Sequence, residues 1–242
     1  MIMKRTTIIL CSLLLAVSMM AQEEMGGFGF HIGYASNILR LNSPTATSSK
    51  KLEPTAMNGL KVGISYDATI AKGFGTTLGI NYTYGAYRSK WTTVSSMSTD
   101  QTCYRDIYQG LELFCDWQYK FEIAGDTYVI LYSGPTIQCH LTLSEQEYVR
   151  SSDGTTQPPR VRYGYEYRNN DSFEDYRRIN VLWGVGAGFQ YKRFFLRGGY
   201  DFGLINPYKY DTFKAMGINS DYYTRGRFDQ WQIKLGMYLW QI

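Results

Sequence analysis

Hydrophobic and polar residues alternate with a period of two along most of this chain. The clearest segment is 110–121, where the odd positions from Leu111 to Phe121 are apolar and even positions such as Glu112 and Lys120 are polar. Because successive side chains of a β-strand point to opposite faces, this pattern predicts a strand with one apolar and one polar face.

Seven more segments show the same alternation, so the chain contains a series of eight predicted strands. These segments are 26–36, 59–70, 76–87, 127–140, 180–191, 194–204 and 230–240. Pro135 lies inside the segment 127–140. Because proline cannot donate a ladder hydrogen bond, it predicts a bulge or a local break in strand pairing.

The connections between the predicted strands alternate between short and long. Three are short, at 71–75, 122–126 and 192–193, and four are long, at 37–58, 88–109, 141–179 and 205–229. Short turns at one end and long loops at the other are typical of bacterial outer-membrane barrels. The sequence therefore predicts an all-β fold, an eight-stranded antiparallel up-and-down transmembrane β-barrel in the cell outer membrane.

The two faces of the predicted strands differ in a way that orients them. The apolar face carries large side chains such as Trp117, Trp183 and Trp231, and the lumen of an eight-stranded barrel has little room for them. The other face carries glycines and charges, and each charge turned to lipid near the midplane would cost up to about 2–4 kcal/mol. A soluble barrel with its apolar face inward is the alternative. We expect a lumen charge network of paired opposite signs, formed by Lys61, Asp67, Glu112, Asp116, Lys120, Arg197, Asp201 and Lys234.

Aromatic residues make up 16% of the chain and gather towards both ends of the predicted strands. Because amphipathic rings favour the interface between membrane and water, two aromatic girdles are expected. The girdle at the short-turn ends comprises Tyr119, Phe121, Phe189, Tyr191 and Phe194. The girdle at the long-loop ends comprises Tyr34, Tyr82, Tyr84, Trp183, Tyr200 and Trp231.

The first 21 residues have the features of an export signal. Lys4 and Arg5 precede an apolar run at 7–20 that is too short to span a bilayer, and Ala21 offers a cleavage point. We expect residues 1–21 to be a signal peptide and residues 22–242 to be the outer-membrane barrel domain. The formal net charge of +4 gives no reason to expect a nucleic-acid partner.

The two histidines are the first candidates for chemistry. His31 and His140 are predicted to face the lumen as hydrogen-bonded residues, and His140 is followed on the same face by Thr142 and Ser144. Barrel-embedded lipid A deacylases pair a His with a Ser two residues away, whereas Thr142 holds that position here. Nucleophilic catalysis also needs a third group that orients the base. We therefore expect no enzyme activity, and we expect no metal and no cofactor.

The cysteines do not form a disulfide framework or a zinc site, because three remain beyond the predicted signal and none lies in a Cys-x-x-Cys pair. Cys115 and Cys139 are predicted to face outward as apolar filler without facing each other. Cys103 is predicted to be an exposed thiol in a long loop.

Several motifs resemble those of a known family. They are Gly110-Leu-Glu-Leu-Phe, Gln118-Tyr-Lys-Phe, Tyr128, Ser133-Gly-Pro, Gly184-Val-Gly-Ala-Gly-Phe and Gly199-Tyr-Asp-Phe-Gly-Leu. Over residues 26–242 the chain is similar to the porin-like outer-membrane β-barrels of Bacteroidota, the PorT type. It departs from that family at Phe114 and Gln118, where proline and lysine are common. The resemblance implies an eight-stranded barrel, and a subset of the family acts in type IX secretion.

We expect function at the long loops, because recognition concentrates on loops held by a rigid scaffold. The expected protein is a monomeric binding or structural barrel with a plugged lumen. Its expected partners are outer-membrane lipid or lipopolysaccharide, and an extracellular ligand or another outer-membrane protein. Residues 161–168 predict that the flanking strands continue as a hairpin beyond the membrane, with Gln157-Pro-Pro as a turn. The alternatives are an accessory barrel of a type IX-like secretion system and, less favoured, a lipid A-modifying hydrolase.

Overall fold

The computed structural model describes residues 24–42, 55–71, 73–93, 100–158, 160–165, 177–207 and 225–241, and all regular structure in these ranges is β. The predicted signal peptide lies outside them. No helix of the described residues is long and apolar enough to cross a membrane. The strands are β1 (Glu24–Asn42), β2 (Thr55–Ala71), β3 (Phe74–Arg88), β4 (Thr92–Thr93), β5 (Gln101–Ala124), β6 (Thr127–Arg150), β7 (Arg160–Tyr165), β8 (Ile179–Tyr191), β9 (Phe194–Gly203) and β10 (Arg225–Gln241).

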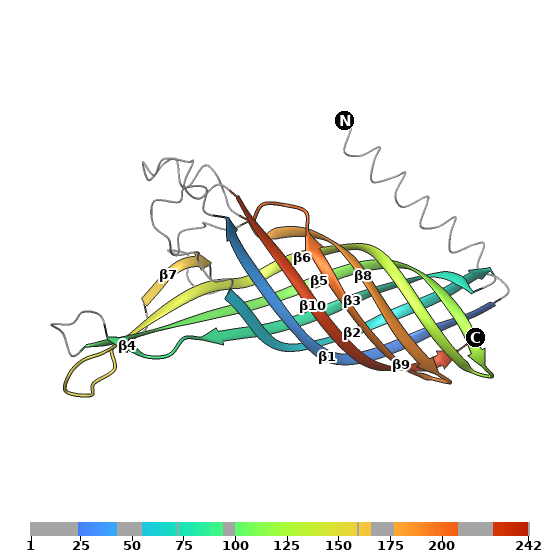
Figure 1. Cartoon of the computed structure of the whole chain (residues 1–242), viewed down its shortest axis with the longest axis horizontal. Helices are drawn as coiled ribbons and strands as arrows, with labels where there is room; N and C mark the ends of the chain where they lie inside the picture. The colour runs from blue at the N-terminus through green and yellow to red at the C-terminus, as the bar shows by residue number, and fades with distance from the viewer. Residues whose placement is uncertain are drawn as a thin grey trace.

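Eight of these strands form a closed ring. Neighbours pair antiparallel in the order β1, β2, β3, β5, β6, β8, β9 and β10, and the pairing of β10 with β1 closes the barrel (Figure 1). The closure is long, running from Gly27↔Gln241 to Asn42↔Arg225. The predicted eight-stranded antiparallel barrel is confirmed.

Three tight turns lie at one end of the barrel, which we call the short-turn end. They connect β2 to β3, β5 to β6 and β8 to β9. Gly73, Asp126 and Lys192 have φ angles of 83°, 53° and 51°, which place them in the left-handed region. Two-residue hairpins favour positive φ because the resulting turn matches the twist of the strands. The beginning of β1 and the end of β10 lie at this same end (Figure 1).

At the opposite, long-loop end, β5 and β6 extend well beyond their neighbours. The two strands stay paired out to Gln101↔Arg150, while β4 pairs with β5 and β7 pairs with β6. We call the part of these four strands beyond the ring the projecting sheet (Figure 1). The expectation that 88–109 and 141–179 are loops was therefore wrong for much of their length. The hairpin expected beyond the membrane exists as β6 and β7, and residues 166–176 lie outside the described ranges.

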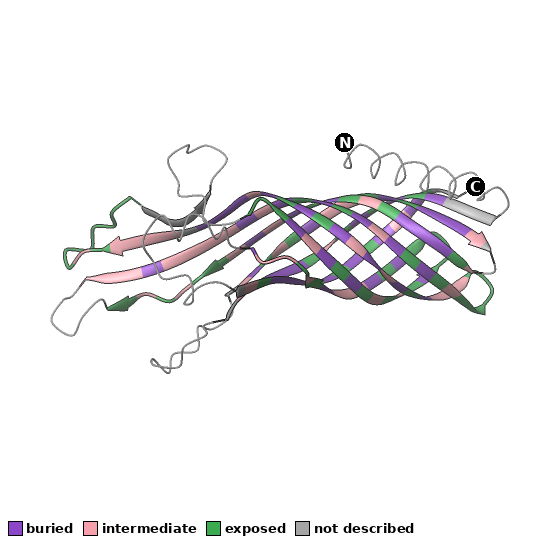
Figure 2. Cartoon of the chain, turned by 90° about the horizontal axis from the view of Figure 1, so that it is seen from above, coloured by how far each residue is buried: buried purple, intermediate pink, exposed green. Residues whose placement is uncertain are grey.

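Burial alternates along the barrel strands (Figure 2). On β5, for example, Leu113 is 55% exposed on the outer face, whereas Glu112 is 1% exposed and faces the lumen. Pro135 pairs in register with Trp183 on β8, but the ladder between β6 and β5 skips from Thr136 to Ser133. This confirms the local break in pairing at the proline.

Candidate functional site

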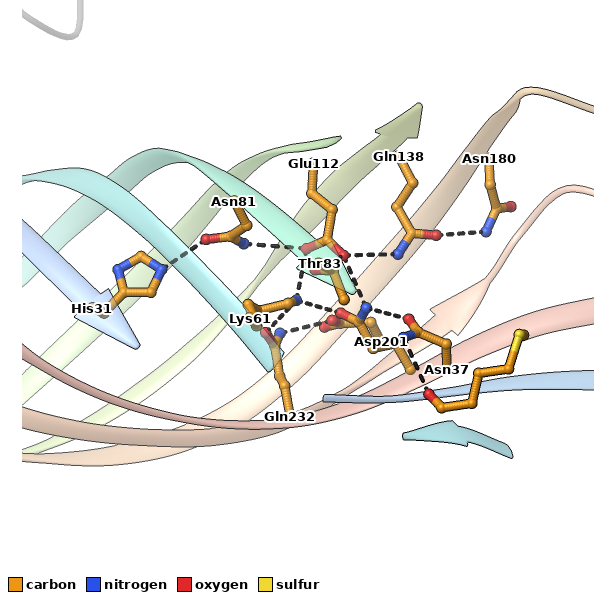
Figure 3. A network of polar contacts seen from close by, with 12 residues as sticks. His31, Asn37, Lys61, Asn81, Thr83, Glu112, Gln138, Asn180, Asp201 and Gln232 are labelled. Carbon is orange, nitrogen blue, oxygen red and sulfur yellow. Dashed lines mark hydrogen bonds and ion pairs between the residues drawn. The ribbon is translucent and has the colours of Figure 1, made fainter. Parts of the chain in front are cut away.

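A single connected network of polar side chains crosses the middle of the lumen (Figure 3). All eight strands of the ring contribute to it: His31 and Asn37 from β1, Lys61 from β2, Asn81 and Thr83 from β3, Glu112 from β5, Gln138 from β6, Asn180 from β8, Asp201 from β9, and Gln230 and Gln232 from β10. The alternation of the strands points each of these side chains inward, and closure of the ring brings them together.

Glu112 is the centre of this network. Lys61 Nζ lies 2.6 Å from Glu112 Oε2, and both side chains are fully buried. Thr83 Oγ1 donates to Oε1 at 2.9 Å, and Gln230 Nε2 donates to the same oxygen at 2.9 Å. Amide donors at 3.2 Å come from Asn81 and Gln138 (Figure 3). The carboxylate is therefore surrounded by donors, as a buried charge requires.

The donors around Glu112 are themselves held in place by further contacts. Lys61 Nζ also donates to Gln230 Oε1 at 2.5 Å and to Gln232 Oε1 at 2.7 Å. Gln232 Nε2 in turn donates to Asp201 Oδ2 at 2.7 Å. These amides link the Lys61 ammonium group to the carboxylates of Glu112 and Asp201. With Glu112, Gln230 and Gln232 as acceptors, all three N–H donors of Lys61 are used within the network.

A second carboxylate, Asp67, collects donors nearer the short-turn end. Lys120 Nζ lies 2.8 Å from Asp67 Oδ2, and Arg197 Nη2 lies 3.5 Å from the same oxygen. Tyr238 Oη donates to Asp67 at 2.5 Å, and Gln118 Nε2 also donates to it. Asp67 is therefore shared between Lys120 and Arg197, so Arg197 is not the sole partner that neutralises the Asp67 carboxylate.

The structure brings five of the eight predicted lumen charges into ion pairs. The pairs join β2 to β5, as Lys61–Glu112 and Asp67–Lys120, and β2 to β9, as Asp67–Arg197. Asp116, Asp201 and Lys234 are also buried, and among the described residues they form no ion pair within 4.0 Å.

Inward-facing rings lie on both sides of the polar network. Towards the short-turn end, Phe195 packs against Tyr238 with ring centroids 4.9 Å apart, and Lys234 Nζ lies 4.6 Å from the centroid of Phe114. Towards the long-loop end, a buried cluster is formed by Met57, Tyr108, Leu143 and Phe228. These residues are apolar, but they stand on the strand faces whose other residues are mostly polar. The alternation of side chains therefore places them inward, although their apolar character by itself suggests the outer face.

The outer face carries the predicted girdle residues. Tyr84 and Tyr200 are half-buried, and the others are exposed: Tyr34, Tyr82, Tyr119, Phe121, Trp183, Phe189, Tyr191, Phe194 and Trp231. Trp117 and Trp183 contact each other on this face with ring centroids 5.8 Å apart. Apolar side chains therefore cover the outer face, as a barrel wall in contact with lipid requires.

The two histidines are both buried. His31 Nε2 lies 2.7 Å from Asn81 Oδ1. Among the described residues, the ring nitrogens of His140 have no hydrogen-bond partner, which differs from the expectation for this residue. His140 instead packs between Tyr108 and Phe228, with centroids 5.3 Å and 5.0 Å away. Within the part of the chain that the structure describes, no hydroxyl is hydrogen-bonded to either ring nitrogen of His140.

The three cysteines of the described ranges, Cys103, Cys115 and Cys139, are free. Cys139 is exposed and pairs in register with Leu111, so it does not face Cys115, as expected. Cys103 lies in the projecting sheet and is fully buried, which contradicts the prediction of an exposed thiol. Its Sγ donates to the carbonyl oxygen of Ser89 at 3.2 Å and accepts from Arg88 Nε at 3.4 Å. Within the described ranges, no group of three or more His, Cys, Asp or Glu residues is placed to hold a metal ion.

Residues 20–208 match the family model described as the outer membrane protein beta-barrel domain. No curated protein matches the chain. Among solved structures, it is similar to Ail, the attachment invasion locus protein of Yersinia pestis in complex with the heparin analogue sucrose octasulfate, at 10% identity and a TM-score of 0.39, covering 90% of this chain and 99% of Ail. It is similar to Neisserial surface protein A at 12% identity and a TM-score of 0.40, covering 90% of this chain and 100% of the other. It is similar to the N-terminal β-barrel domain of Pseudomonas aeruginosa OprF at 9% identity and a TM-score of 0.30, covering 86% and 97%.

Proposed function

We propose, from the premise that this chain belongs to the family of outer membrane protein β-barrel domains, that it is a non-conducting barrel which presents a recognition sheet at the cell surface. The protein is an outer-membrane barrel of the Gram-negative cell envelope. In such barrels the short turns face the periplasm and the long loops lie outside the cell. The projecting sheet is therefore extracellular.

The connected lumen network carries the proposal that the barrel is plugged. Side chains from all eight strands meet around Glu112, and the Lys61 and Glu112 side chains are both fully buried. Opening an ion path through this layer would separate a buried ion pair, which is costly when either partner loses its counterion. Rings of one sign of charge are typical of pores that select and pass ions. The mixed and mutually bonded charges of this lumen favour closure.

Single-channel recording in planar bilayers tests the plug. We expect the purified wild-type barrel to show no stable openings of porin size. A variant with Lys61→Ala and Glu112→Ala should conduct more than the wild type, since it removes the central ion pair. Its openings also serve as the control that the purified barrel inserts into the bilayer. Long-lived openings of porin size from the wild-type protein would overturn the plug.

The projecting sheet, together with Arg88 at the end of β3 and Trp91 just before β4, offers the surface that recognition requires. The guanidinium carbon of Arg150 lies 4.5 Å from the Trp91 ring centroid, and that of Arg88 lies 6.0 Å from the same centroid. Arg88 also stacks on Tyr148 at 6.0 Å, and Tyr104 Oη lies 3.3 Å from Glu147 Oε1. Rings and arginines are the residues that dominate binding surfaces, because they are large and amphipathic. We propose that this sheet binds a peptide, a glycan or another outer-membrane protein.

A binding assay on cells that display the barrel tests the sheet. The probes are an array of glycans and a displayed library of random peptides. We expect Trp91→Ala with Arg150→Ala to abolish the binding that the wild type shows, and Gln157→Ala, an exposed turn residue, to preserve it. Deletion of 151–170 should leave the barrel folded, as judged by heat-dependent gel migration, while altering that binding. If this deletion prevents assembly, the sheet is structural and the recognition proposal fails.

The motif resemblance favours a second candidate function, an accessory barrel of the PorT type in a type IX-like secretion system of Bacteroidota. Its support is the set of motifs on β5, β6, β8 and β9, such as Gly184-Val-Gly-Ala-Gly-Phe. The test is a strain that lacks the protein: loss of type IX export would favour this role, and unchanged export would eliminate it. The lipid A hydrolase has no support from the position of His140.

We propose further that residues 1–21 are removed during export. The support is the basic and apolar pattern of this segment. Amino-terminal sequencing of the protein from purified outer membranes should begin at Gln22. A sequence beginning at Met1 would contradict the proposal.

A further inference from the structure

Two arginines stand side by side on the outer face of the barrel, at its extracellular end. Arg40 on β1 and Arg227 on β10 are directly opposite each other in the strand register. They lie on the face that carries Tyr34 and Trp231, which are 39% and 40% exposed and whose ring centroids are 5.2 Å apart. The arginines therefore lie just beyond the aromatic girdle, at the level where lipid headgroups begin.

Asp229 holds the two arginines together. By alternation it belongs to the outer face of β10, yet its side chain is 0% exposed. Its Oδ2 accepts from Arg40 Nε at 3.0 Å, from Arg227 Nε at 2.9 Å and from Tyr200 Oη at 2.9 Å. Its Oδ1 accepts from the backbone N–H of Gly203 at 3.0 Å.

This arrangement has a chemical consequence for the two guanidinium groups. Like charges directly opposite each other on two strands repel, so a carboxylate between them is needed to keep them adjacent. Both arginines bind Asp229 through Nε, which leaves their terminal Nη groups for other partners. Arg40 Nη2 reaches Tyr200 Oη at 3.4 Å, and within the described residues the Nη groups of Arg227 make no hydrogen bond. The side chains of Arg40 and Arg227 remain 42% and 46% exposed.

We propose that Arg40, Arg227 and Asp229 form a binding site for the phosphate group of a glycolipid in the outer leaflet. Two planar guanidinium groups fixed side by side match the geometry of a phosphate, which accepts paired N–H bonds from each fork. The charges of the three side chains sum to +1, which favours an anion. The position on the lipid-facing wall, in contact with the girdle residue Tyr200, makes a membrane lipid the occupant and leaves the acyl chains against the apolar outer face.

This site rests on the outer-membrane location of the barrel and is independent of both the plug and the projecting sheet. Phosphate could also come from solution, so the source is decided by the probe. The probes are phosphorylated lipid A, the same lipid A after chemical dephosphorylation, and inorganic phosphate. Native mass spectrometry of the purified mature barrel in detergent counts the bound lipid at each concentration.

We expect the wild-type barrel to bind phosphorylated lipid A at least about tenfold more tightly than the dephosphorylated form, a difference that corresponds to about 1.4 kcal/mol. Inorganic phosphate at millimolar concentration should compete only weakly. Equal affinity for the two forms of lipid A would overturn the proposal without any variant. Complete competition by inorganic phosphate would make the site one for soluble anions, which also overturns it.

Variants then assign the preference to these residues. Arg40→Gln with Arg227→Gln should remove the preference for the phosphorylated form. Arg193→Gln, an exposed arginine at the periplasmic turn between β8 and β9, should keep it. An equal loss in the control variant would show that net charge, not this site, attracts the lipid.

Asp229→Asn separates a built site from general attraction. This change removes one negative charge from the site, so general electrostatic attraction predicts tighter binding of the lipid phosphate. Our proposal predicts weaker binding, because the two guanidinium groups lose the carboxylate that holds them adjacent. Heat-dependent gel migration confirms that each variant is folded before its lipid binding is compared. Tighter binding by Asp229→Asn would overturn the proposal.

Discussion

Two buried carboxylates, Glu112 in the lumen and Asp229 on the outer face, accept similar numbers of hydrogen bonds but have different surroundings. Glu112 is 1% exposed, and its donors Lys61, Thr83 and Gln138 are each 0% exposed. Asp229 is also 0% exposed, but its two arginine donors are 42% and 46% exposed. One carboxylate is therefore enclosed by its donors, and the other is enclosed by donors that still face lipid and headgroups.

The difference lies in what the donors do with their remaining N–H groups. Lys61 donates to two glutamines as well as to Glu112, so its hydrogen bonds are used inside the lumen. The arginines around Asp229 use Nε for the carboxylate and keep Nη groups directed elsewhere. A cluster whose hydrogen-bond donors are all used inside the protein stabilises the barrel, whereas a cluster with donors left over can bind a ligand. Substitutions that remove one partner from each cluster test this distinction.

The largest effect is expected from Lys61→Met. This change leaves Glu112 buried without its cation, which should destabilise the barrel by about 3–5 kcal/mol. The measurement is urea unfolding of the barrel refolded into lipid vesicles, followed by tryptophan fluorescence. Lys90→Met, an exposed lysine outside the ring, is the matched control and should change the free energy of unfolding by less than about 0.5 kcal/mol.

The double variant with Lys61→Met and Glu112→Gln separates the pair from its individual charges. Because it removes both charges together, it should recover most of the stability lost in Lys61→Met. If the double variant is as unstable as the sum of the two single variants, the ion pair does not organise the network. In that case the amides alone hold the lumen side chains in place.

A smaller effect is expected from Arg197→Ala. Asp67 keeps Lys120 at 2.8 Å and Tyr238 at 2.5 Å, so it does not become an isolated charge. The loss of charge-assisted hydrogen bonds should cost about 1.5–3 kcal/mol in the same unfolding assay. Arg197→Lys keeps the cation but loses the guanidinium fork that reaches Gln118 and Thr77, so its free energy of unfolding should lie between those of the wild type and Arg197→Ala. A loss as large as that of Lys61→Met would contradict the sharing of Asp67.

The strands of the ring could be predicted from sequence because lipid demands an apolar outer face. That demand ends where the chain leaves the membrane. In the half of β5 nearer the long-loop end, residues such as Tyr104, Arg105 and Asp106 follow one another without forming an apolar face, so 88–109 was predicted as a loop. The backbone pairing with β6 continues there without the pattern that reveals it.

The network around Glu112 could be predicted only in part, for a geometric reason. Alternation tells which face a side chain occupies but not its height in the lumen, and height decides which partners meet. Gln230 reaches Glu112 from the far side of the ring, 118 residues away in sequence. The inward position of Phe228 was missed because this residue falls in the predicted loop 205–229, and that of Phe195 was missed because an apolar residue is unusual on a mostly polar face. Asp229 was assigned to the loop 205–229, so its role could not be predicted.

A still smaller effect on stability is expected from Asp229→Asn, about 1–2 kcal/mol, because the two arginines it leaves behind can bind water or headgroups. The cost should come partly from repulsion between the arginines. Adding Arg40→Gln to Asp229→Asn should therefore recover part of the loss in the vesicle unfolding assay. If the second change adds further destabilisation instead, repulsion is not the source of the cost.

The smallest effect on stability, and the sharpest contrast with Lys61→Met, is expected from Arg40→Gln. Its side chain is 42% exposed, and removing one exposed partner of an ion pair should cost only about 0.2–1 kcal/mol of unfolding free energy. Asp229 keeps Arg227, Tyr200 and the Gly203 N–H, so the carboxylate stays satisfied. The same change removes one of the two forks proposed to hold a lipid phosphate, so the preference for phosphorylated over dephosphorylated lipid A should fall severalfold. The two measurements made on one variant decide whether this cluster is built for binding. A large loss of stability with an unchanged lipid preference would assign it to the barrel wall, in the same class as Glu112.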